Sequence, residues 1–140
     1  MKRVTAIAAS IIITILTGCG REYHLQGRVV AAEVMSVTGK ITEITGNRMP
    51  EKGTPVQGAA VTIFFELKKD GSPVEESTWK RSFLTDGQGA FDIRDYSIPA
   101  KKTLVGIRIT KPGFDPLYTT YWDYYDIEPQ VFFAEMKPSI

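Results

Sequence analysis

The sequence predicts an all-β fold, a seven-stranded sandwich that follows a cleaved leader segment. Three observations predict this fold. Apolar and polar residues alternate at period two along several short segments, which is the pattern of half-buried strands. Turn signals rich in Gly, Pro and Asp separate these segments. No stretch after residue 19 has the length and periodicity of a helix. With 140 residues the chain is too short for two ordinary domains, so one domain is expected over residues 22–140.

The leader is expected over residues 1–18. Lys2 and Arg3 provide a positive start, and an apolar run covers residues 4–16. A run of this length is typical of a signal peptide, whereas crossing a bilayer takes about 20 apolar residues. The sequence therefore predicts export followed by removal of the leader.

The end of the leader leads into Cys19, the single cysteine of the chain. The sequence Leu-Thr-Gly-Cys at residues 16–19 resembles the lipobox of bacterial lipoproteins. The resemblance implies cleavage between Gly18 and Cys19 and a diacylglycerol on the Cys19 thiol. It also implies attachment to the outer membrane, facing the periplasm, in a host that has one, because residue 20 is not aspartate. An ordinary secretory signal with a chance cysteine and a retained anchor helix are the alternatives.

Residues 19–21 are expected to form a short lipidated tether, and the strands follow in order. They are predicted at 23–30, 59–67, 78–85, 91–93, 104–110, after Pro116 and at 131–136. Asp-Gly-Gln-Gly at residues 86–89 predicts a tight hairpin between the third and fourth of these strands. The residues expected on the inward side of the strands are Val61, Ile63, Phe65, Phe83, Phe91, Val105, Ile107 and Ile109.

Four motifs carry a second resemblance: Gln-Gly-Arg-Val-Val at 26–30, Pro-Val-Gln-Gly-Ala-Ala-Val at 55–61, Thr-Asp-Gly-Gln-Gly-Ala-Phe at 85–91 and Lys-Pro-Gly-Phe at 111–114. In this order they are similar to the carboxypeptidase regulatory-like family. The resemblance implies a transthyretin-like (prealbumin-like) Greek-key sandwich. It leaves function open, because sandwiches of this kind serve unrelated purposes.

Residues 31–54 depart from the family pattern as an insertion. We expect a hairpin extension of the first strand, followed by loop from about residue 46. The segment is either a solvated excursion or an interaction element.

The chemistry-bearing residues are few. Lys and Arg number 17 against 16 Asp and Glu, which gives no general field for nucleic acid. His24 is the only histidine, so a structural or surface role is expected for it, with no metal site and no cofactor. The Asp86 side chain is expected to hydrogen bond the backbone of its own turn, and Asp92 is expected to be solvated.

An aromatic segment near the C-terminus is the most unusual feature. At period two, Tyr118, Trp122 and Tyr124 share one face of a strand, whereas Tyr121 and Tyr125 share the other. One set can be core. The other can contact an envelope protein or a glycan.

These observations predict a non-catalytic binding or accessory module on a lipid-anchored envelope protein, and not an enzyme. A structural subunit of an envelope complex and a hydrolase that uses carboxylates are the alternatives.

Overall fold

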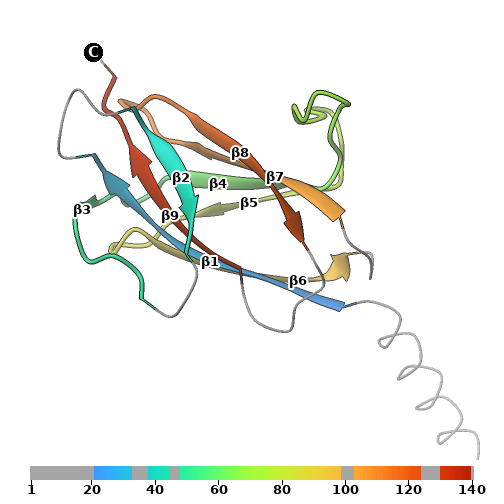
Figure 1. Cartoon of the computed structure of the whole chain (residues 1–140), viewed down its shortest axis with the longest axis horizontal. Coiled ribbons are helices and arrows are strands. Elements are labelled where there is room, and N and C mark those ends of the chain that lie inside the picture. Colours follow the sequence, from blue (N-terminus) through green and yellow to red (C-terminus); the bar gives the residue numbers. More distant parts are fainter. Residues whose placement is uncertain (1–20, 33–37, 45–47, 99–102, 124–129, 140) are drawn as a thin grey trace, which may run out of the picture.

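The computed structural model describes residues 21–32, 38–44, 48–98, 103–123 and 130–139, and the described chain is all β (Figure 1). The strands are β1 (Arg21–Ala31), β2 (Lys40–Glu43), β3 (Thr54–Pro55), β4 (Ala60–Phe64), β5 (Lys80–Leu84), β6 (Ala90–Ile98), β7 (Thr103–Thr110), β8 (Leu117–Asp123) and β9 (Gln130–Met136). No helix within these residues is long and apolar enough to cross a membrane. The predictions for residues 1–18, Cys19 and Gly20 lie outside the described residues.

The strands form two facing sheets, so the predicted β-sandwich is confirmed. The first sheet has the order β2-β9-β1-β3, and β6 also pairs directly with β1, along residues 21–28, before the two residues of β1 that pair with β3. The second sheet has the order β5-β4-β7-β8. β1 runs through the centre of the first sheet, antiparallel to β6 and parallel to β9. Side chains of β6 and of β9 therefore lie next to those of β1.

The core between the sheets consists of the inward residues of both. Seven of the eight predicted core residues are buried, namely Val61, Ile63, Phe65, Phe91, Val105, Ile107 and Ile109. Phe83 is partly buried and packs against this cluster. Because β5 is an edge strand, its inward residue is covered from one side only.

The turn at residues 86–89 is present, but the hairpin predicted there is wrong. Asp86 and Gly89 close the turn with a backbone hydrogen bond of 2.9 Å. β5 before the turn belongs to the second sheet, whereas β6 after it pairs with β1 in the first. Gly89 makes this crossing possible, because it has φ 71° and a Cβ there would lie 2.3 Å from the carbonyl oxygen of Val29.

The insertion does not extend β1 as a hairpin, so that prediction is wrong as well. β2 pairs antiparallel with β9, on the far side of β9 from β1. The chain then has to pass β9 and β1 to reach β3, which pairs with β1 at Val30 and Ala31. Residues 48–53, which we call the strap, make this crossing on the face of the first sheet away from the core.

The strap covers apolar side chains on that outer face. Val30 and Phe133 alternate with core residues of β1 and β9, yet both are buried. A Cβ on Gly53 would lie 2.7 Å from Val30, and the ammonium of Lys52 lies 5.9 Å from the centre of the Phe133 ring. Arg28 holds the strap by donating to the carbonyls of Pro50 at 2.9 Å and Lys52 at 3.3 Å.

Candidate functional site

The predicted aromatic contacts divide between surface and core. Tyr118 and Trp122 lie on the outer face of β8 and are exposed, whereas Tyr121 is buried against Phe132 with ring centres 4.9 Å apart. Tyr124 and Tyr125 lie outside the described residues. The Tyr118 hydroxyl donates to the carbonyl of Gly71 at 2.6 Å, and burial raises the pKa of Tyr118. Tyr118 therefore helps to hold residues 65–79, the β4–β5 loop.

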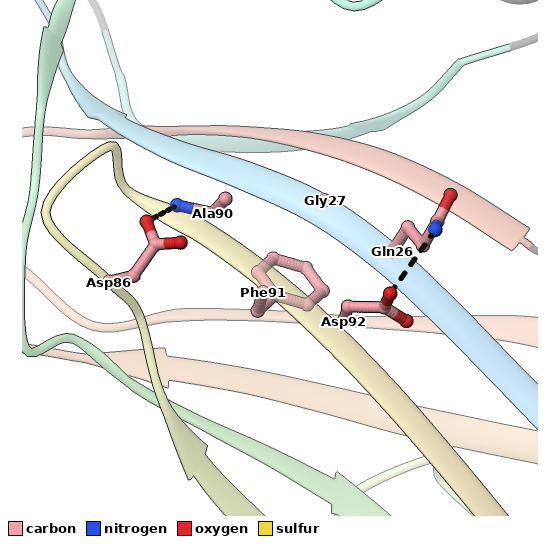
Figure 2. A pocket seen from close by; sticks show the side chains of 6 residues that line it. All are labelled: Gln26, Gly27, Asp86, Ala90, Phe91 and Asp92. Carbon is pink, nitrogen blue, oxygen red and sulfur yellow. Dashed lines mark hydrogen bonds between the residues drawn. The ribbon is translucent and has the colours of Figure 1, made fainter.

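A groove lies along β1 and β6 in a different part of the molecule. It has a volume of about 260 Å³, and its lining comes from three positions in β6, two in β1 and one in the preceding turn: Ala90, Phe91, Asp92, Gln26, Gly27 and Asp86 (Figure 2). This volume lies just below the range of about 300–1,000 Å³ that is usual for ligand sites, so it suits a molecule of about one ring.

Gly27 and Phe91 form the inner wall of this groove. They are opposite each other in the β1–β6 pair. A Cβ on Gly27 would lie 2.2 Å from the Phe91 ring, so the ring occupies the space that a side chain at position 27 would fill. Because Gly27 has no side chain, the Phe91 ring can pack across β1.

A histidine and a carboxylate meet at the edge of the groove. His24 Nε2 and Asp92 Oδ1 are 2.7 Å apart, and the side chains are 16% and 51% exposed. Gln26 donates to the other oxygen of Asp92 at 3.4 Å, as Figure 2 shows. Asp92 therefore lines the groove, and it contacts the imidazole of His24, which is not among the lining residues.

The second carboxylate of the groove is fixed by its turn. Asp86 Oδ1 accepts the backbone N–H groups of Gln88 at 2.9 Å and Ala90 at 3.0 Å. The groove thus presents two carboxylates from neighbouring segments, and such groups recognise ligands that offer hydrogen-bond donors.

No group of three or more His, Cys, Asp and Glu side chains that could hold a metal ion occurs among the described residues. A non-haem iron site of the two-histidine type would in addition need a second histidine, and the sequence has one. The described residues therefore do not fit a metal centre built from these ligands.

Solved structures that resemble this chain are enzymes. The 3-chlorocatechol 1,2-dioxygenase of Rhodococcus opacus 1CP matches with a TM-score of 0.52 and 12% identity, over 86% of this chain and 60% of that one. The catechol 1,2-dioxygenase of Acinetobacter sp. ADP1, inhibited by bound mercury, matches with a TM-score of 0.53 and 14% identity, over 86% and 54%. This chain thus spans less than two thirds of either enzyme. No family model and no curated protein sequence matches it.

The structural matches overturn the prediction of a non-catalytic module that is not an enzyme. That prediction depended on the expected lipid anchor, the sandwich fold and the absence of a catalytic motif. The sandwich found here also occurs in dioxygenases. At 12–14% identity the likeness concerns the fold alone, but the fold can no longer support a non-catalytic role.

Asp86 hydrogen bonds the backbone of its turn, as predicted. His24 was expected to have a structural or surface role and Asp92 to be solvated, and neither prediction joined the two residues in one site. They are 68 positions apart, and the β1–β6 register brings them together. The usable signal was that both occupy outward positions of strands with an apolar alternation, but strand pairing cannot be read from one sequence.

Proposed function

We propose that the chain is a lipoprotein of the bacterial cell envelope, attached through a lipid on Cys19. The charged start, the apolar run and the lipobox-like sequence at 16–19 support this proposal. β1 begins at Arg21, directly after this motif, so the described fold follows the proposed attachment point. In a host with two membranes, the residue at position 20 favours the outer membrane and its periplasmic side.

Replacement of the cysteine tests the anchor. In Cys19→Ser the protein should move from the detergent phase to the aqueous phase of a Triton X-114 separation, because the thiol is the only lipid acceptor proposed. The midpoint of thermal unfolding should stay unchanged, because the described fold begins after residue 20. Recovery of the variant in the detergent phase at its processed size, without the leader, would contradict the proposal.

We further infer that the sandwich acts on a small molecule that offers hydroxyl donors, bound in the groove along β1 and β6. The observation that carries this inference is the His24–Asp92 contact of 2.7 Å at the groove edge. Two carboxylates favour hydroxyl donors over anions, and about 260 Å³ suits a single ring. Catechols, for which the structural neighbours are named, have both properties.

Asp92 and His24 have different roles in this proposal. Asp92 lines the groove and accepts the hydrogen of a ligand hydroxyl. His24 is a positioning residue, which orients the Asp92 carboxylate through their contact of 2.7 Å.

The single histidine makes this proposal testable by NMR. In protein purified without a histidine tag, the ring signals of His24 should shift and saturate as catechol is added. Asp92→Asn should weaken the binding about tenfold, because a hydrogen bond to a charged group is lost. Asp115→Asn, which changes a carboxylate that does not line the groove, should bind like the original protein.

Benzoate provides the ligand control. It has the same ring without a hydroxyl donor, and its carboxylate should be repelled by Asp86 and Asp92. Shifts of equal size with benzoate, or catechol binding unaffected by Asp92→Asn, would leave the His24–Asp92 pair a structural contact between strands.

We also propose that the sandwich has the transthyretin-like Greek-key topology. It is supported by the four motifs of the carboxypeptidase regulatory-like resemblance, of which the one at 85–91 contains the turn into β6. An experimental structure whose strands cannot be superposed on such a sandwich in the same chain order would contradict this assignment.

A further inference from the structure

Both tryptophans of the chain are exposed to a large extent. Trp79 immediately precedes β5 and is 39% exposed, and Trp122, the penultimate residue of β8, is 46% exposed. The sequence contains no other tryptophan. Tryptophan has a large apolar ring and one N–H donor, so it is suited to a boundary between an apolar and a wet environment.

Strand pairing places Trp122 at the end of the sandwich where β1 begins. Arg21, the first residue of β1, is opposite Ile98 at the end of β6. Residues 99–102 join Ile98 to Thr103, a span of at most about 17 Å. Thr103 is opposite Asp123, the neighbour of Trp122. Figure 1 shows the start of β1, the end of β6, the start of β7 and the end of β8 on the same side of the molecule.

Trp79 belongs to the same end. Its carbonyl accepts the backbone N–H of Phe65 at 3.1 Å. The Phe65 ring in turn meets the Tyr23 ring edge-on, with centres 5.4 Å apart, and Tyr23 is the third residue of β1. Leu84, an apolar side chain that is 70% exposed, lies elsewhere, because it is opposite Ala60, which pairs with Thr110 at the far end of β7.

We propose that this end of the sandwich rests on the lipid headgroups of the membrane, with Trp79 and Trp122 in the interface. The inference rests on the proposed lipid on Cys19. Only residue 20 separates Cys19 from the start of β1, so the tether spans at most about 7 Å. Such a tether holds the two rings at the depth where tryptophan is enriched in membrane proteins.

Fluorescence of the mature lipidated protein, which begins at Cys19, in phosphatidylcholine vesicles tests this placement. Part of the lipid carries bromine near the headgroup end of its acyl chains, which quenches tryptophan at interfacial depth. Trp79→Phe reports on Trp122 alone, and Trp122→Phe reports on Trp79 alone. The matched control combines both substitutions with Leu84→Trp and so places the only tryptophan at the far end.

We expect loss of fluorescence for Trp79 and for Trp122, but not for the control. A flexible stalk of about 15 residues inserted after residue 20 should restore the fluorescence of both, because it lets the domain leave the surface. Tryptophans quenched no more than the control, in protein that sediments with the vesicles, would overturn the inference and leave the anchor standing. Protein that does not sediment with the vesicles would overturn the anchor, and the inference with it.

Discussion

Part of the outer face of each sheet is covered, but by segments of different construction. On the first sheet the strap, residues 48–53, lies over Val30 and Phe133. On the second sheet Phe64 is fully buried on the outer side of β4, next to the β4–β5 loop, residues 65–79. Each cover is held by an arginine of the strand beneath it, Arg28 for the strap and Arg108 for the loop.

The two arginines bind different partners. Arg28 donates to main-chain carbonyls of the strap, which carry no titratable group. Arg108 lies over the Phe64 ring, 4.8 Å from its centre, and donates to both oxygens of Glu75, at 3.2 Å for Oε2. The strap is thus fastened through its backbone and the loop through an ion pair. The difference predicts that the two covers respond to different perturbations.

The largest expected effect comes from the apolar side chains under the covers. Phe133→Ala and Phe64→Ala should each lower the free energy of unfolding by about 3–5 kcal/mol, because both rings are buried and each change leaves a cavity. Urea denaturation of the variants measures the loss.

Ile107→Ala is the reference for this comparison. Ile107 lies between the sheets and is fully buried, so the change should cost about 2–5 kcal/mol. Loss of stability in Ile107→Ala but not in the two phenylalanine variants would show that the covers do not exclude water. Unchanged stability of Ile107→Ala itself would contradict the strand register.

The burial of Val30, Phe64 and Phe133 also shows how far the sequence predicts this fold. The alternating runs predicted most strands and the core between the sheets, because period two is a local property. The same runs contain apolar neighbours such as Val29-Val30 and Phe132-Phe133, which are typical of strands covered on both faces. What covers the second face depends on how a loop folds back over its sheet, the strap over Val30 and Phe133 and the β4–β5 loop over Phe64, and the alternation of residues along a strand does not show this.

The candidate groove was less predictable for a related reason. His24 in β1 and Asp92 in β6 are separated in the chain order by β2 to β5, and two of these strands belong to the second sheet. Their contact depends on the β1–β6 pairing, and that pairing follows from a turn that crosses between sheets instead of forming a hairpin. The motif at 85–91 indicated a turn correctly, but the destination of the following strand depends on long-range packing.

Arg28 is expected to show the next largest effect. Arg28→Ala removes two hydrogen bonds from a charged donor to the strap and a third, of 3.4 Å, to the carbonyl of Gln88, and it should cost about 1.5–3 kcal/mol. In this variant, deuterium exchange of the amides of residues 48–53 should speed up more, relative to the original protein, than exchange in the β4–β5 loop. Arg28→Lys keeps the charge but not the fork of donors, so a full rescue would show that charge alone holds the strap.

Substitution of one glycine in each cover tests how closely the cover packs on the side chains beneath it, with a smaller expected loss of stability. Gly53 in the strap has φ 88° and Gly71 in the loop has φ 87°, so alanine at either position costs about 1–2 kcal/mol for the left-handed backbone. A Cβ at Gly53 would lie 2.7 Å from Val30, whereas at Gly71 the nearest atom is 3.8 Å away in Thr120. Gly53→Ala should therefore be the more destabilising variant in thermal unfolding. Equal losses would mean that the strap can move away from Val30.

The smallest expected effect is a dependence on pH that distinguishes the two covers. The hydrogen bond from Arg108 lowers the pKa of Glu75, and the charges of Arg108, Lys80 and Lys68 lower it further. In the same loop, hydrogen bonds from Ser72 lower the pKa of Asp70. A carboxyl whose pKa is lower in the folded state stabilises that state above its unfolded pKa, and the contribution is lost as the pH falls through the folded pKa.

Acid should therefore loosen the β4–β5 loop before it affects the strap. As the pH falls below about 4.5, amide NMR signals of residues 65–79 should shift or broaden, while those of 48–53 stay in place. Glu75→Gln should remove most of this response, and Glu76→Gln, which alters the neighbouring carboxylate, should retain it. Because both loop carboxylates are exposed, the effect on global stability is small and the local signals are the appropriate readout. Simultaneous loosening of both covers would show that they open together, through the sandwich core they share, and not through their separate fastenings.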